Sequence, residues 1–303
     1  MTELSRTILE TWQVRKTRQQ KTDFIAFLQA EFPDLQVEQG KFGVRNLVLG
    51  NVAEADVVLG AHYDTCARLP FPNFLTPKNF LCYLAYQLLL LIPLFGISFL
   101  LSFFLTLAGV PGEVTYWLVL AAYFVLLVLM MAGPANRHTV NDNTSGVITL
   151  LECFAAMSEE ERRRTAFVFF DLEESGLIGS AQFAKRHKAE MKGKLLLNFD
   201  CVSDGDHFLV IANKKARAAH EDALRAAYGE TPEGKTVAFE KSSTTIYPSD
   251  QANFPVSVAF AAFKRSRVCG LYLDRIHTKR DTVMEERNIR YLVDGTLLLV
   301  NQK

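Results

Sequence analysis

The sequence lacks an excess of either charge. Its 303 residues include 33 Lys and Arg and 33 Asp and Glu, so the formal net charge is zero. Without a basic surplus there is no general electrostatic case for nucleic-acid binding. Hydrophobic residues make up 49% of the chain and charged residues 22%, a composition that excludes disordered and fibrous proteins. We therefore expect a globular protein with no nucleic-acid partner.

Cysteine is scarce and shows no pairing pattern. The five cysteines are far apart, their number is odd, and no CxxC occurs. This usage predicts free thiols in a reducing compartment instead of a disulfide framework. Residues 1–30 contain no apolar stretch of the kind found in a secretory signal and have helical spacing instead. Both features favour a cytoplasmic location.

Charge is almost absent from one block of the chain. Residues 79–136 contain a single charged residue, Glu113. An apolar run from Leu81 to Ala108 is followed by a Gly- and Pro-rich turn at 109–112 and a second run from Thr115 to Ala132. A membrane-spanning helix needs about 20 apolar residues, so the first run is ample and the second just sufficient. The block predicts a transmembrane helical hairpin; the alternative is a hairpin buried in a large soluble core.

The charges that flank this block predict its orientation. Arg68 and Lys78 precede the block and Arg137 follows it, whereas the turn between the runs carries only Glu113. Lys and Arg near membrane ends favour the cytoplasmic side. The sequence thus predicts a membrane protein with two spans, whose hairpin at 79–136 contacts the lipid bilayer. Residues 1–78 and 137–303 are predicted to form one discontinuous catalytic domain in the cytoplasm.

Outside the block, apolar runs alternate with helical patterns. The predicted strands are Val44–Leu49, Asp56–Gly60, Thr165–Phe170, Lys194–Phe199, Phe208–Ile211, Val256–Phe263 and Gly270–Leu273. The predicted helices are Thr144–Met157, Gly179–Lys188, Lys215–Ala227 and a C-terminal helix that ends near Val300. Thr282–Glu285 has the form of a capping box and is predicted to start this last helix. The alternation indicates an α/β fold with a sheet covered by helices on both faces.

Polar residues follow three of the predicted strands directly. His62 and Asp64 end one strand, Asp171–Glu174 ends the next, and Asp200 ends a third. Ligands of open α/β sheets bind outside the carboxyl ends of strands, so these segments are expected to converge. Asp142, just before a helix, and His277, in a loop, extend the set.

Two histidines and several carboxylates suit a pair of divalent metal ions, zinc above all. Imidazole and carboxylate groups both bind zinc, and a central carboxylate can bridge two ions. Asp64 lies two residues after His62 on the same strand face, so it can accept the ring N–H that points away from the metal. Glu173 and Glu174 are adjacent and point in different directions, so one can bind metal while the other takes a proton. Each residue alone has a simpler structural explanation; the ordered combination carries the prediction.

Five ordered segments resemble the zinc exopeptidases of peptidase family M28: GAHYDT, NDNTSG, DLEESGLIGS, NFDCVSDGD and IHTKRDT. The resemblance implies a three-layer sandwich with a central mixed β-sheet, of the phosphorylase/hydrolase-like, zinc-exopeptidase type. It also implies two Zn²⁺ ions per chain. His62 and Asp200 would bind one ion, Glu174 and His277 would bind the other, and Asp142 would bridge them.

The resemblance further implies that Glu173 is the general base and that Asp64 orients His62. The implied activity is that of an aminopeptidase, which removes N-terminal residues from peptides with a free N-terminus; with the predicted hairpin it would be membrane-anchored. Some relatives have a Tyr before the last ligand histidine to hold the oxyanion, whereas this chain has Ile276.

Three other functions stay open. One is a dizinc carboxypeptidase or amide deacylase of related fold, and another is a non-catalytic peptidase-like membrane receptor or scaffold. The third is a glutaminyl-cyclase-like transferase, against which the Glu173–Glu174 pair favours hydrolysis.

Overall fold

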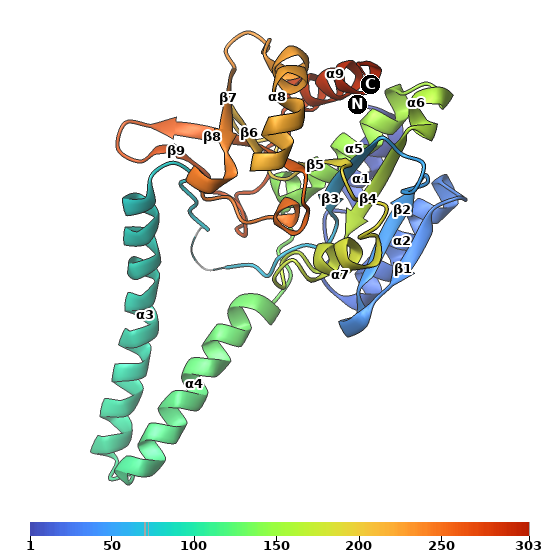
Figure 1. Ribbon diagram of the computed structural model, residues 1–303. Coiled ribbons are helices and arrows are strands. Elements are labelled where there is room, and N and C mark those ends of the chain that lie inside the picture. Colours follow the sequence, from blue (N-terminus) through green and yellow to red (C-terminus); the bar gives the residue numbers. More distant parts are fainter. Residues whose placement is uncertain (70, 72, 303) are drawn as a thin grey trace.

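The computed structural model describes residues 1–69, 71 and 73–302 and is built on one nine-stranded sheet (Figure 1). Eight strands run in the order β1-β2-β4-β3-β5-β8-β6-β7, and β9 pairs with β8. Their bounds are β1 Gln36–Gln39, β2 Arg45–Leu49, β3 Val57–His62, β4 Thr165–Phe170, β5 Leu195–Phe199, β6 His207–Ala212, β7 Thr236–Lys241, β8 Ser257–Ser266 and β9 Gly270–Tyr272.

The strand directions confirm the predicted mixed sheet. In the middle, β3 pairs in parallel with β4 and β5, and β5 pairs in parallel with β8. Antiparallel pairs lie further out, between β2 and β4 and between β6 and β8. Because β3, β4 and β5 are parallel, their carboxyl ends meet at one edge, where His62, Phe170 and Phe199 are the last residues.

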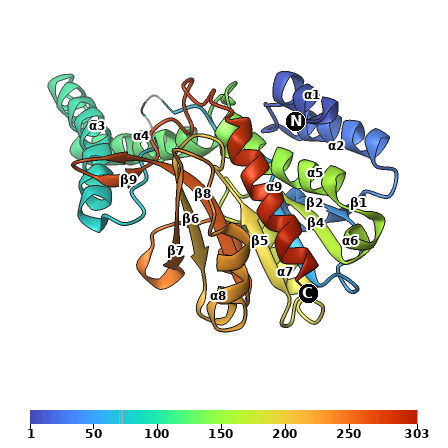
Figure 2. The same cartoon turned by 90° about the horizontal axis from the view of Figure 1, so that it is seen from above.

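Helices cover both faces of the sheet, as the α/β prediction requires. Their bounds are α1 Glu3–Thr11, α2 Arg18–Glu31, α5 Ser145–Ala156, α6 Glu159–Arg163, α7 Ile178–Arg186, α8 Lys214–Tyr228 and α9 Glu286–Asn301. In β4, Phe167 and Phe169 join the apolar cluster beneath α1, α2, α5, α8 and α9, whereas Val168 and Phe170 join the one beneath α7. Successive strand side chains point to opposite faces, so a strand buried on both reads as a continuous apolar run. Figure 2 shows α5 and α9 lying across the sheet.

The uncharged block forms two long helices, α3 (Phe80–Leu107) and α4 (Gly112–Ala132), which extend away from the sheet as a hairpin (Figure 1). No residue of α3 and only Thr115 of α4 is buried. The alternative of a hairpin inside a soluble core is therefore wrong. Both helices have the length and hydropathy of a membrane span. These two properties are a weak indication by themselves, because core helices and signal sequences share them.

The prediction of unpaired cysteines is wrong for one pair. Cys82, near the start of α3, forms a disulfide with Cys269, which lies between β8 and β9. The two residues are 187 positions apart in the sequence, so no spacing pattern could indicate the pair. The other three cysteines are free and buried.

The predicted capping box before the last helix is also wrong. Helix α9 begins at Glu286, and Glu285 makes no side-chain cap. Other contacts hold this segment in an extended form: the Lys235 ammonium donates to the Glu285 carboxylate, and the Ser203 hydroxyl donates to the carbonyl oxygen of Val283 at 2.7 Å. Tertiary contacts thus override the local helix signal.

Candidate metal centre

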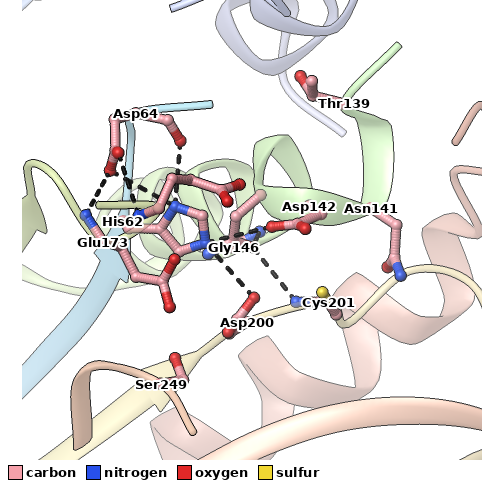
Figure 3. Close-up of polar contacts among 12 residues, drawn as sticks. His62, Asp64, Thr139, Asn141, Asp142, Gly146, Glu173, Asp200, Cys201 and Ser249 are labelled. Carbon is pink, nitrogen blue, oxygen red and sulfur yellow. Dashed lines mark hydrogen bonds and ion pairs between the residues drawn. The ribbon is translucent and has the colours of Figure 1, made fainter. Parts of the chain in front are cut away.

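The end of β3 fixes the His62 ring. Its Nδ1 lies 3.0 Å from the backbone carbonyl oxygen of Asp64. A carbonyl can only accept, so Nδ1 carries the proton and Nε2 keeps a free lone pair. Nε2 faces two carboxylates, 3.3 Å from Oδ1 of Asp142 and 3.5 Å from Oδ1 of Asp200 (Figure 3). The imidazole is thus oriented as a metal ligand would be.

Asp142 lies between the two predicted ligand histidines. Its Oδ1 faces His62 Nε2, and its Oδ2 lies 3.0 Å from Nε2 of His277. The same His277 nitrogen lies 3.3 Å from Oε2 of Glu174. One carboxylate therefore presents an oxygen to each histidine, an arrangement suited to bridging two ions.

The donor atoms of this cluster fit divalent metal ions. His62, Glu173 and Asp200 offer ligand atoms within 4.8 Å of one another, as do His62, Asp142 and Glu174. Three of these atoms are buried without a hydrogen-bond partner: Nε2 of His62, Oε1 of Glu174 and Oδ1 of Asp200. An unsatisfied buried polar atom costs about 1–3 kcal/mol, so these three atoms suit contact with a cation. Nitrogen and oxygen donors in this mixture suit zinc.

Two cysteines also approach the cluster, although the sequence predicted none as a ligand. Cys66 lies near Glu174 and His277, and Cys201 near Asp142 and Asp200. Burial raises the pKa of both thiols well above the usual value, and the nearby carboxylates raise it further. Since the thiolate is the form that binds metal, the carboxylates and imidazoles are the better ligands.

The crowding of carboxylates gives the cluster a strong demand for cations. Burial raises the pKa of Glu174 to about 8, although His277 opposes this. Burial also raises the pKa of Glu173, with Glu174 and Asp200 adding to the effect. Burial lowers the pKa of His277, but Glu174 and Asp142 outweigh it and raise that pKa to about 9. Glu173, Glu174 and His277 thus favour their protonated forms, and a metal ion bound there would compete with these protons.

Asp64 does not bind His62 in the predicted way. Its carboxylate Oδ1 is 3.7 Å from Nδ1 of His62, and the ring hydrogen bond goes to the Asp64 backbone instead. The carboxylate accepts the backbone N–H groups of Glu173 at 3.0 Å and Glu174 at 3.3 Å. The turn after β4 points both N–H groups at Asp64, so this residue positions the glutamate pair as well as the ring (Figure 3).

We expect Asp64→Asn to weaken activity without removing the site. An amide offers one acceptor oxygen, and its NH₂ group would oppose one of the two backbone donors. Losses of this kind are typically about 10–100-fold in metal affinity or activity. Metal titration and kcat/KM of the variant measure this effect; values equal to those of the wild type would contradict the positioning role.

Asp281 holds the backbone of Asp142 in place, a role that the sequence did not reveal. Its carboxylate accepts the backbone N–H groups of Asn141 at 2.7 Å and Asp142 at 3.1 Å. Burial raises the pKa of Asp281 to about 7, an effect that Asp142 reinforces. The Asn141 side chain in turn accepts backbone N–H groups of Ser203 and Asp204. The only available signal was the position of Asp281 in the IHTKRDT segment.

Two buried cations from the N-terminal region hold the strand ends. Lys21 donates to Oδ1 of Asp171 at 2.6 Å, which anchors the start of the Asp171–Glu174 segment. Arg15 donates from Nε to the carbonyl oxygen of Tyr63 at 2.6 Å, between His62 and Asp64. Burial lowers the pKa of Arg15 to about 10, although Asp64 opposes this. No sequence pattern links either residue to the site, because both lie far from it in the chain.

Backbone geometry around the cluster is tight. Gly146, the second residue of α5, lies so close to β5 that a Cβ there would be 2.3 Å from the carbonyl oxygen of Phe199, so a side chain is excluded. Leu172, Cys201 and His277 all have φ between 53° and 61°, a region that non-glycine residues rarely occupy. Such residues gather at functional sites, and each of these is a predicted metal ligand or catalytic residue or adjoins one.

A cavity of 410 Å³ opens onto the cluster. Asp142, Glu173, Glu174, Asp200 and His277 line one side of it, so all these side chains are accessible to a small molecule. Ile276 also lines it and offers no hydroxyl. Tyr247, which the sequence analysis did not single out, also lines the cavity, and its hydroxyl donates to the carbonyl oxygen of Asp200 at 2.8 Å.

Solved structures share this fold. The LapA aminopeptidase of Legionella pneumophila has a TM-score of 0.57 at 12% identity, covering 99% of this chain and 68% of that one. A Zn-dependent exopeptidase from Parabacteroides distasonis has a TM-score of 0.57 at 13% identity, covering 99% and 97%. The glutaminyl cyclase of Porphyromonas gingivalis has a TM-score of 0.55 at 15% identity, covering 98% and 96%. At these identities the likeness shows the fold alone.

At the level of sequence, no curated protein matches the chain. The model of peptidase family M28 matches residues 128–292, more than half of the chain. The matched region includes Asp142, Glu173, Glu174, Asp200 and His277. By this match, the chain belongs to peptidase family M28.

Proposed function

We propose that this protein is a zinc-dependent aminopeptidase with two metal ions per chain. The observation that carries the proposal is the position of Asp142, whose two oxygens face different histidines beside three orphaned ligand atoms. In this proposal His62 and Asp200 hold one ion, Glu174 and His277 hold the other, and Asp142 bridges them.

The metal ions would supply Lewis acidity, which polarises the scissile carbonyl and stabilises negative charge on it. The chain itself would manage the proton. Glu173 lies in the cavity beside the cluster, so its carboxylate is placed to take a proton from the attacking water and return it to the leaving amine. Asp64 fixes the backbone of Glu173 and Glu174, so the base and the ligand keep their relative positions.

Metal content and substrate direction test the proposal together. We expect the loaded protein to hold close to two zinc ions and to cleave aminoacyl chromogenic substrates that have a free amine. Peptides with a blocked N-terminus and a free C-terminal carboxylate, together with N-acyl amino acids, serve as the control, since a carboxypeptidase would cleave the former and an amide deacylase the latter. Substrates with N-terminal glutamine distinguish hydrolysis from cyclisation. A protein that binds metal but converts none of these substrates would be a receptor or scaffold.

We also propose that the α3–α4 hairpin anchors this domain in a lipid bilayer. Its apolar side chains face outward along both helices, and Phe99, Phe104 and Trp117 are at least 60% exposed. Apolar surface on this scale is costly in water and indicates an interaction with a membrane or a protein. The lengths of 28 and 21 residues match a bilayer core.

In this proposal the catalytic domain lies on the cytoplasmic side, and the positions of the basic residues support this orientation. Arg68, Lys78 and Arg137 flank the hairpin at the domain end, and the far turn has only Glu113. Disulfides are rare in the cytosol, so the disulfide between Cys82 and Cys269 means that cysteine usage no longer supports a cytoplasmic location. The charge distribution therefore carries this part of the proposal.

Cysteine labelling in intact cells checks the orientation. A membrane-impermeant maleimide is expected to label Glu113→Cys from outside and Leu298→Cys, on α9, only after permeabilisation. The reverse pattern would place the domain outside. Labelling of both positions without permeabilisation would show that the hairpin does not cross the membrane.

A further inference from the structure

We propose that the base of the α3–α4 hairpin forms an apolar subsite that selects substrates with a bulky apolar side chain next to the scissile bond. The proposal rests on the aminopeptidase function proposed above and assigns part of its specificity to the inserted hairpin. The residues concerned are Leu90 of α3 and Met130 and Met131 of α4, which act together with Leu69 and Phe71.

These residues line a second cavity, of 240 Å³, that adjoins the metal cluster. It shares four lining residues with the larger cavity: Asn73, Gln87, Glu174 and His277. Two of the four are predicted metal ligands, so a group bound there would lie beside the reacting bond. A pocket for a whole drug-sized ligand has about 300–1,000 Å³, so the smaller cavity suits one side chain of a substrate held in the larger one.

The spacing on α3 shows that one face of this helix is directed at the site. Tyr83, Gln87 and Leu90 are separated by four and three residues, which places them on one side of the helix. All three are partly buried, whereas Leu88 and Leu89 between them are more than half exposed. The face that lines the cavities is therefore distinct from the face available to lipid.

Both helices are fixed to the domain at this end. On the α3 side, the Lys78–Glu240 ion pair, at 2.6 Å, holds the chain just before the helix. On the α4 side, Lys16 donates from Nζ to the carbonyl oxygen of Met131 at 2.7 Å. A cation at a helix C-terminus is a favourable contact. The walls of the subsite are thus held in place relative to the metal ligands.

The lining defines the chemistry of the bound group. Leu69, Phe71, Leu90, Met130 and Met131 form the apolar part of the lining, and its one carboxylate, Glu174, is proposed to bind metal. Burial of an ammonium or carboxylate side chain there is therefore unfavourable. Methionine side chains are flexible and adapt to apolar groups of different shapes. A leucine or phenylalanine side chain fits this surface, whereas alanine would leave the cavity unfilled.

Kinetics on the full, zinc-loaded chain in detergent provide the first test. For the wild type, kcat/KM with leucyl and phenylalanyl nitroanilides is expected to exceed that with alanyl and lysyl nitroanilides by about tenfold or more. Met130→Trp should fill the subsite and lower kcat/KM for the leucyl and phenylalanyl substrates more than for the alanyl substrate, so that the advantage disappears. Leu129→Trp is the matched control, because Leu129 is the neighbouring residue, 52% exposed, and should change nothing. An equal loss on all substrates, or no loss with Met130→Trp, would overturn the subsite.

Binding without turnover provides the second test. Met130→Cys is expected to react with a maleimide, and free L-leucine or L-phenylalanine should protect it where L-alanine does not; Leu129→Cys should show no protection. If the wild type cleaves no aminoacyl substrate and leucine still protects Met130→Cys, the aminopeptidase proposal fails and the subsite stands. If Met130→Cys is labelled to the same extent in the presence of L-leucine, L-phenylalanine and L-alanine, the subsite proposal is wrong, whether or not the enzyme is active.

Discussion

Glu173→Gln is expected to lower kcat by about 100–10,000-fold while the metal content stays near two ions per chain. The carboxylate of Glu173 is placed to move a proton, and an amide of the same shape cannot accept one. Asp64 binds the backbone of Glu173 and not its side chain, so the substitution leaves the local fold intact. Removal of a proton acceptor thus separates catalysis from metal binding.

Glu174→Gln is the matched comparison, since it makes the same chemical change one residue further on. Glu174 lies 3.3 Å from His277 and has a buried oxygen without a partner, so its loss is expected to lower metal occupancy. Steady-state kinetics combined with elemental analysis of both variants measure the two effects. Near-normal kcat in Glu173→Gln, or loss of metal from it, would show that Glu173 is not the base.

The strands that carry the site were predictable because they are buried on both faces. Each of β3, β4 and β5 is a short apolar run followed by a polar residue, and that pattern is visible without any tertiary information. The edge strands β1 and β7 were missed for the opposite reason. Their sequences, QVEQ and TVAFEK, are partly exposed and largely polar or interrupted, so no apolar run marks them.

The predicted site residues converge because the sheet brings strand ends together, but their supports could not be read from the sequence. Lys21 and Asp171 are 150 positions apart, and the Asp281 contact to Asn141 spans 140. Contacts over such distances leave no spacing pattern. The Asp64 role was mispredicted for a related reason: the HxD spacing indicates proximity, whereas the direction of the carboxylate depends on the turn after β4.

Replacing Asp142 is expected to affect both metal sites at once. Its Oδ1 faces His62 and its Oδ2 faces His277, so Asp142→Ala removes a ligand from each proposed ion and leaves the two histidines without their central carboxylate. We expect metal content to fall from about two ions to nearly none and activity to be lost.

Asp200→Asn is the control for this prediction. Asp200 contacts only one of the two ligand histidines: its Oδ1 lies 3.5 Å from Nε2 of His62. This variant should keep the ion held by Glu174 and His277, so elemental analysis should return close to one ion per chain. Circular dichroism establishes that both variants are folded, which separates loss of metal from loss of structure. If Asp142→Ala and Asp200→Asn each retain one ion, Asp142 belongs to a single site and the bridged pair is ruled out. If Asp142→Ala alone loses both, the shared carboxylate is what makes the two sites interdependent.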